Sequence, residues 1–158
     1  MIFHHLQALS KLSGKYNVRN VFLHGSYDEA DFLPFIDSVI SKFDFNIVYL
    51  QESDQSMSLQ GGLQALVKHQ EILMAESPIF LLVMNCNICS SFPLYSMLEF
   101  QERKQAMLTI MTTQDEQDEN HAIGSFNKDP STSEMIHYTE GGKRSNLSVN
   151  CGVYLFST

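Results

Sequence analysis

Six consecutive apolar residues, 79–84, form the segment that most restricts how this chain can fold. Pro78 precedes them, and the small polar residues Asn85, Cys86 and Asn87 follow them. So short a run without polar members is typical of a strand buried on both faces of a parallel sheet. Ligands of open α/β sheets bind just beyond the carboxyl ends of such strands. We therefore expect a site near Asn87, where an amide stands at a position that phosphate chemistry would give to a carboxylate.

Composition limits the class of protein. The 158 residues are 44% hydrophobic, which is enough for one domain with a core, so we treat residues 1–158 as a single domain. A net charge of −8 with scattered basic residues argues against binding to nucleic acid or to anionic lipid. No apolar run approaches the roughly 20 residues needed to cross a bilayer. The three cysteines are an odd number without framework spacing, so we expect reduced thiols in a cytosolic protein.

Hydrophobic periodicity predicts strands and helices in alternation up to residue 111. Short strand-like pieces follow, separated by turns, of which residues 129–133 are the clearest. This order predicts an α/β fold, a mostly parallel sheet with helices on both faces. The predicted helices are 1–12, 32–43, 62–74 and 94–104, and the predicted strands are 18–23, 47–50, 79–84, 107–111, 123–126, 135–139 and 149–156.

The helix predicted at 32–43 has local signals at its start. Asp28 or Asp31 can cap it, and we expect Pro34 in its first turn. Doubly wound domains usually begin with a strand and a phosphate-gripping loop, whereas this chain begins with a predicted helix. It stops directly after a predicted strand. We therefore expect a partial domain that lacks the first strand and the Gly-rich loop.

Several stretches of this chain, taken in order, resemble the sugar-nucleotide pyrophosphorylases, and among them the alpha-type subunits of mannose-1-phosphate guanylyltransferase. The matching blocks keep the order and spacing of that family over nearly the whole chain. The blocks that carry the resemblance are residues 1–8, 20–27, 48–52 with 61–63, 85–94, 129–140 and 150–156.

The resemblance implies a Rossmann-like nucleotidyltransferase domain. It also implies a Mg²⁺-dependent reaction in which a sugar 1-phosphate attacks the α-phosphate of a nucleoside triphosphate. Similarity to the alpha-type subunits implies a regulatory role for this protein. It also implies GDP-mannose or a related sugar nucleotide as ligand and a catalytic guanylyltransferase subunit as partner. The binding residues implied by the resemblance are Gly61, Gly62, Asn87, Gly124, Glu140, Asn150 and Gly152.

This sequence departs from the family pattern where charge matters most. The metal-site Asp of the family falls on Asn87, whose amide has no negative charge, so we do not expect it to be a metal ligand. The family's Glu-Lys-Pro becomes Glu140 followed by two glycines, which removes a phosphate-facing lysine. We therefore expect a protein that binds a sugar nucleotide but is impaired in catalysis.

Other interpretations of the same residues remain open. Gly61 and Gly62 also fit a plain turn into a helix, and Asn87 fits a strand-end Asn that bonds its own backbone. Glu140 also fits a solvated turn residue, and Gly152 fits a β-bulge. Two other functions stay open as well: an active fragment completed by another chain, and an interaction module like a TIR domain. We expect Asn87 and Glu140 to face one shared cleft if the sugar-nucleotide interpretation is right.

Overall fold

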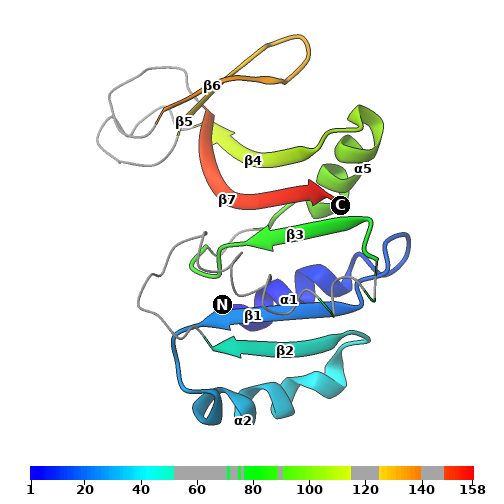
Figure 1. The fold of residues 1–158 in the computed structure, drawn as a ribbon, viewed down its shortest axis with the longest axis vertical. Helices are drawn as coiled ribbons and strands as arrows, with labels where there is room; N and C mark the ends of the chain where they lie inside the picture. Colours follow the sequence, from blue (N-terminus) through cyan, green and yellow to red (C-terminus); the bar gives the residue numbers. More distant parts are fainter. Residues whose placement is uncertain (52–70, 72–74, 76, 89–90, 115–124, 140–147) are drawn as a thin grey trace. The chain divides into compact units, whose positions relative to one another are not determined.

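The computed structural model divides the chain into two compact units, Met1–Pro78 and Ile79–Thr158, and each has its own sheet. Figure 1 presents the elements of both units, coloured along the sequence. The structure describes residues 1–51, 71, 75, 77–88, 91–114, 125–139 and 148–158.

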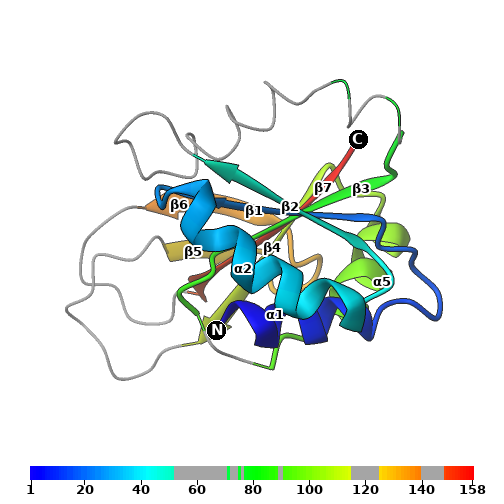
Figure 2. The same ribbon diagram turned by 90° about the horizontal axis from the view of Figure 1, so that it is seen from below.

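The first unit contains a pair of parallel strands. Asn20 lies opposite Asn46 at one end of the pair, and Gly25 lies opposite Gln51 at the other. Both described α-helices lie on the same side of the two strands (Figure 2). The parallel direction predicted from strand–helix alternation is therefore confirmed in this unit. Its elements are α1 (Ile2–Ser10), β1 (Asn20–Gly25), α2 (Glu29–Val39), η1 (Ile40–Lys42) and β2 (Asn46–Gln51).

A core of buried side chains from both helices and both strands holds this unit together. Helix α2 contributes residues three apart, the spacing that places them on one face. Full burial of a large apolar side chain contributes about 1.5–3 kcal/mol, so each member of this cluster stabilises the unit by roughly that amount. The buried members are Leu6, Leu23, Ile36, Val39, Phe45, Ile47 and Tyr49.

Of the two caps that the sequence offered, Asp28 is the one that starts helix α2. The Asp28 carboxylate accepts the backbone N–H of Ala30 at 3.0 Å, and the helix starts at the next residue, Glu29. Pro34 therefore lies beyond the first turn, inside the helix. The prediction that Pro34 sits in the first turn was wrong because the cap at Asp28 sets the start, several residues before the apolar stripe becomes visible.

The second unit is a five-stranded antiparallel sheet with one described helix (Figure 1). β7 pairs with three strands, namely β3, β4 and β5, and β6 pairs with β5. The prediction of a mostly parallel sheet is therefore wrong for this unit. Its elements are β3 (Phe80–Met84), α5 (Leu94–Lys104), β4 (Leu108–Gln114), β5 (Ser125–Lys128), β6 (Met135–Thr139) and β7 (Ser148–Ser157).

The prediction failed because β7, which is distant in the sequence, pairs with both β3 and β4. β3 and β4 do run in the same direction, as the helix between them predicts, because each is antiparallel to β7. They pair with β7 and not with each other. Local alternation predicted their direction correctly but carried no information about the strand that pairs with both.

Two further expectations are corrected by this sheet. The five residues of β3 are half-buried, whereas the sequence predicted a strand buried on both faces. A TIR-like interaction module would have shown a five-stranded parallel sheet without final hairpins. The five-stranded sheet described here is antiparallel and includes the β5–β6 hairpin, so that alternative has no support.

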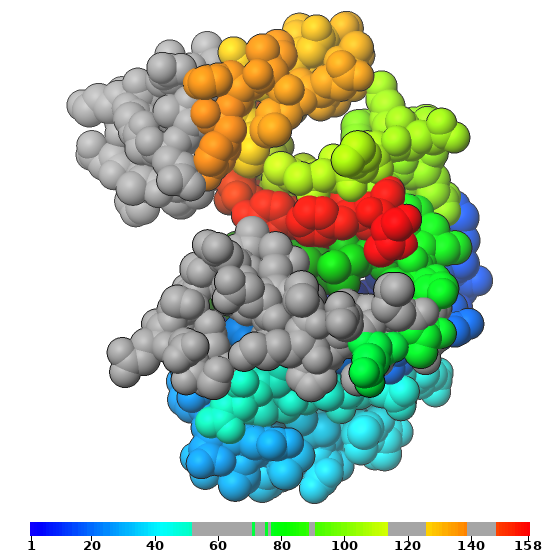
Figure 3. All heavy atoms as spheres, viewed as in Figure 1, coloured from blue at the N-terminus to red at the C-terminus, as the bar shows by residue number. Residues whose placement is uncertain are grey.

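The β5–β6 hairpin closes at the turn predicted for residues 129–133. The Asp129 carboxylate accepts the backbone N–H groups of Ser131 at 2.7 Å and Thr132 at 3.0 Å, and the Ser131 hydroxyl at 2.5 Å. These bonds to the ionised form lower the pKa of Asp129. In Figure 3 the hairpin, coloured yellow to orange, projects from the body of the unit, and Met135 and Ile136 are exposed on it.

Gln101 fixes helix α5 to the sheet through its side-chain amide, which is almost completely buried. Its Nε2 donates to the backbone oxygen of Ala106 at 2.7 Å and to the Ser157 hydroxyl at 2.8 Å. Its Oε1 accepts the hydroxyl of Thr109. A buried amide that bonds at both ends stabilises one arrangement, because every alternative leaves polar groups unpaired.

The substitution Gln101→Leu should lower the free energy of unfolding by about 2–3 kcal/mol, because the Thr109 hydroxyl then loses its acceptor inside the protein. Urea denaturation of the full chain measures this change. Gln7→Leu, the same substitution at an exposed position of α1, is the matched control and should change stability by less than about 0.5 kcal/mol. Equal effects of the two substitutions would contradict the role given to Gln101.

Ser131→Ala should raise the pKa of Asp129, because the largest stabilisation of its carboxylate comes from the Ser131 side chain. The lowered pKa in the folded chain means that this turn's contribution to stability is complete above the ordinary Asp value, near 3.9. The contribution is lost as the pH falls through the lower folded value. Titration of the Asp129 carboxyl carbon by NMR measures the shift. An unchanged midpoint in Ser131→Ala, matching that in the control Ser91→Ala, would refute the assignment.

Candidate functional site

Three of the residues predicted to bind a ligand lie in the described part of the chain, and all three belong to the second unit. Asn87 lies in an exposed turn after β3, and Asn150 and Gly152 lie on β7. The other four predicted residues fall outside the described residues, so the shared cleft expected for Asn87 and Glu140 stays a prediction. Those four are Gly61, Gly62, Gly124 and Glu140.

Strand pairing brings the turn after β3 beside the middle of β7. Met84, the last residue of β3, lies opposite Val153. One residue further, the backbone N–H of Asn85 donates to the carbonyl oxygen of Gly152 at 2.9 Å. Segments far apart in the sequence therefore meet at the position where the sequence predicted a site. We call Asn85, Asn87, Asn150, Gly152 and Tyr154 the strand-end cluster.

Gly152 is required at this point by both conformation and space. Its φ of 66° lies in the left-handed region, which residues with a side chain rarely adopt. A Cβ built on Gly152 would lie 2.9 Å from Cγ of Asn85, and closer still to the amide nitrogen of that side chain. The pairing of β4 with β7 also shifts register between Ile110 and Thr112, so β7 has the irregularity that the bulge interpretation of Gly152 expected.

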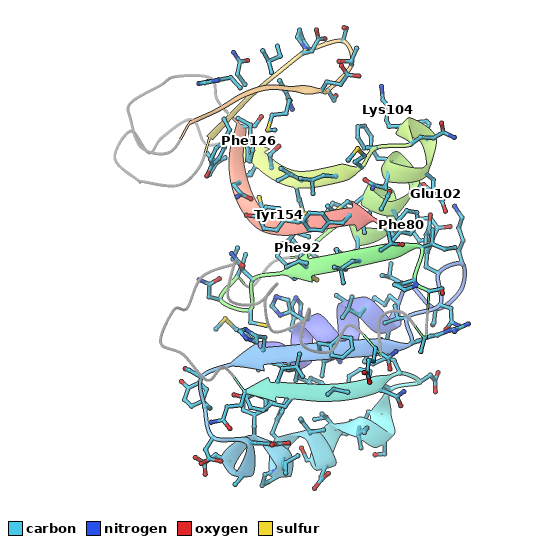
Figure 4. All side chains as sticks on the ribbon, in the orientation of Figure 1. Phe80, Phe92, Glu102, Lys104, Phe126 and Tyr154 are labelled. Carbon is cyan, nitrogen blue, oxygen red and sulfur yellow. The ribbon has the colours of Figure 1, made fainter. Side chains whose placement is uncertain are left out.

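The side chain of Asn150 supports the irregular backbone of β7. Its Oδ1 accepts the backbone N–H of Gly152 at 2.9 Å, and its Nδ2 donates to the hydroxyl oxygen of Tyr154 at 2.6 Å. The Tyr154 oxygen is thus an acceptor from Asn150 and keeps its own O–H to donate elsewhere. Figure 4 labels Tyr154 on β7, and the residue is half-buried.

Sequence reasoning missed two members of the cluster, Asn85 and Tyr154, as candidate site residues. The spacing of Asn150, Gly152 and Tyr154 at every second position was a usable signal, because alternate residues of a strand share a face. For Asn85 the signal was its place directly after the strand at whose end a site was predicted. Its contact with Gly152 depends on the pairing of β3 with β7.

The described members of the cluster are neutral, and this decides what they can bind. Amides and a phenol both donate and accept hydrogen bonds, as recognition of sugar hydroxyls requires. Mg²⁺ instead prefers oxygen ligands that include one or two carboxylates. Within the described residues no group of three or more His, Cys, Asp or Glu side chains could hold a metal ion. The described residues of the cluster therefore do not fit the Mg²⁺ that the family resemblance implies.

The thiols near the cluster are free where they are described. Cys86 is exposed in the turn after β3 and Cys151 is half-buried on β7. Partial desolvation raises the pKa of both thiols, so both are protonated at neutral pH.

The carboxyl ends of the parallel strands in the first unit have a different character. Asp28 caps the helix that follows β1, and Glu29 and Asp31 add negative charge to its first turn. Tyr49 on β2 donates its hydroxyl to the backbone oxygen of Tyr27 at 2.8 Å, which holds the loop after β1. Three carboxylates at a helix start disfavour an anion there. The described part of this edge therefore does not form a phosphate site.

Comparisons with known proteins agree on one family. The family model described as "Nucleotidyl transferase" matches residues 7–158. A probable mannose-1-phosphate guanyltransferase of Schizosaccharomyces pombe is 38% identical over 160 residues, covering 99% of this chain and 37% of the relative. The mannose-1-phosphate guanylyltransferase regulatory subunits alpha of Dictyostelium discoideum and Homo sapiens are 32% and 31% identical, again over 99% of this chain.

The chain spans a little more than one third of the length of these relatives, 37% of the Dictyostelium discoideum protein and 36% of the human one. None of the described helices has both the length and the apolar composition needed to cross a bilayer.

Gly152→Ala should lower the free energy of unfolding by about 2–3 kcal/mol, because the left-handed conformation and the clash with Asn85 add together. Thermal or urea denaturation of the full chain measures the loss. Gly14→Ala is the matched control, since a Cβ there would meet no atom within 4 Å. A Gly152→Ala chain as stable as the Gly14→Ala chain would refute the close approach of Asn85.

Proposed function

The chain belongs to the nucleotidyl transferase family, and from that premise we propose that it is a regulatory, catalytically impaired relative of mannose-1-phosphate guanylyltransferase. Its ligand is GDP-mannose or a related sugar nucleotide. Its role lies in GDP-mannose biosynthesis, beside a catalytic guanylyltransferase subunit. The names of the relatives support this choice of substrate class, and two of the three relatives reported above are named as regulatory subunits.

One observation carries the proposal: the turn that contains Asn87 is hydrogen-bonded to β7, and the Asn87 side chain is uncharged. The hydrogen bond from Asn85 to Gly152 fixes the chain two residues before Asn87. Phosphoryl transfer depends on positioned charge and metal, which neutralise the transferring group. An amide at this position keeps the hydrogen bonding that a ligand needs and loses the charge that the reaction needs.

The geometry of β7 supports a pocket for the sugar part of the ligand. Asn150 uses one amide hydrogen and one lone pair internally, so a second hydrogen and a second lone pair remain for a ligand. Tyr154 adds a hydroxyl that Asn150 holds in position. Glu140, Gly61, Gly62 and Gly124 stay sequence-based predictions for ligand binding, outside the described residues.

We further propose that the two compact units act as one nucleotidyltransferase domain over residues 1–158, of the Rossmann-like kind. The family match supports this, since it runs across the boundary between Pro78 and Ile79. The free thiols of Cys86 and Cys151 support a cytosolic location, where thiols stay reduced.

Calorimetric titration of the full chain with GDP-mannose tests the proposal. We expect saturable binding, with a Kd in the micromolar to millimolar range, about −8 to −4 kcal/mol. Asn150→Ala should weaken binding at least about tenfold. The substitution removes the amide groups left for the ligand and the hydrogen bond that holds the Tyr154 hydroxyl. The matched control, Asn17→Ala at an exposed position of the first unit, should bind like the parent chain. Absence of heat and of thermal stabilisation at millimolar ligand would refute sugar-nucleotide binding.

A second measurement separates impaired from active protein. The chain is incubated with GTP, mannose 1-phosphate and Mg²⁺, and pyrophosphate release is followed against a blank without protein. We expect no release above the blank. Release above it would refute the impaired role and favour an active fragment.

A further inference from the structure

We infer that the strand-end cluster binds its sugar nucleotide without a divalent cation. This inference rests on the proposed function and adds how the ligand is held. Its starting point is the disagreement between a family of phosphoryl-transfer enzymes, which use metal ions, and the neutral residues found at this strand end.

The turn after β3 offers poor ligands for a hard cation. Cys86 is a soft sulfur ligand, which suits other metals. The side chain of Asn85 packs against Gly152, and a Cβ on that glycine would clash with it. The side-chain oxygens of Asn85 and Asn87, both exposed residues of this turn, are neutral.

The part of β7 that lies beside this turn adds no charge either. The side-chain amide oxygen of Asn150, which accepts the N–H of Gly152 at 2.9 Å, is neutral. Tyr154 contributes a phenol that accepts from Asn150. The described residues of the cluster supply no carboxylate. A cation placed here would therefore find negative charge only on the phosphates of the ligand. Removing the cation therefore costs the complex little.

Neutral hydrogen bonds take the place of the metal in holding the ligand. The Tyr154 hydroxyl and the second amide hydrogen of Asn150 are donors, and hydroxyl groups of a sugar are matching acceptors. Such bonds do not depend on the presence of a cation. The binding constant is therefore the same with and without Mg²⁺.

The test is a pair of titrations of the full chain with GDP-mannose, one in excess EDTA and one in excess MgCl₂. We expect the two Kd values to agree within about twofold. Binding that weakens at least about tenfold in EDTA would overturn the inference while leaving the proposed function intact. Absence of binding in both buffers would overturn the proposed function, and the inference with it.

Asn87→Asp supplies the missing carboxylate and gives an independent readout. Its GDP-mannose affinity should become Mg²⁺-dependent, tighter in MgCl₂ than in EDTA by about tenfold, because a carboxylate can share the cation with the ligand's phosphates. The control Asn127→Asp adds the same charge on β5, at an exposed position, and should show no such difference. An Asn87→Asp chain whose Kd is the same in both buffers would overturn the role given to Asn87.

Discussion

The pairing of β7 with three other strands is the constraint on which the second unit depends. β3 and β5 lie along one edge of β7 and β4 along the other, because the residues of β7 that pair with β4 overlap those that pair with β3 and with β5. The sheet therefore forms only after a segment near residue 150 has reached partners that begin at residue 80. Closing such loops costs entropy before the contacts form, so local sequence gives little warning of them. Gln101 then fixes α5 to this sheet through polar bonds that tolerate no shift of the helix.

The candidate site is a direct product of the same pairing. Gly152 in its left-handed conformation, the side chain of Asn85 against it and the Asn150 amide that accepts its N–H form one local arrangement. A strained backbone persists only where its surroundings determine it, and such positions are often functional. The polar groups gathered here are neutral, which favours recognition of hydroxyl groups over neutralisation of transferring phosphate. Family membership fixes the ancestry of the domain, and the charge of these few residues is the physical argument for a binding role.

The first unit gives a useful contrast. Its two strands are parallel, and its helix α2 begins after the capping aspartate Asp28, as the sequence led us to expect. Asp28, Glu29 and Asp31 nevertheless lie at the start of the helix that follows β1, where they disfavour a phosphate. A fold that places ligands at strand ends therefore does not make every strand end a site. The chemistry of the side chains decides between them.

The sequence by itself determined the positions of most elements: α5 runs over the residues predicted for it, as does β6, and β3 differs from its prediction by one residue. The resemblance it carries led to the correct family, and the ligand-binding roles it implies for Asn87, Asn150 and Gly152 stay predictions. These features depend on local periodicity, turn residues and short motifs, all of which can be read within a window of the chain. The tertiary structure alone decided that β7 pairs with both β3 and β4, that Asn85 packs against Gly152, and that Tyr154 joins Asn150. Strand partners are chosen by contacts between distant segments, and the free energy of those contacts is not encoded in the spacing of neighbouring residues.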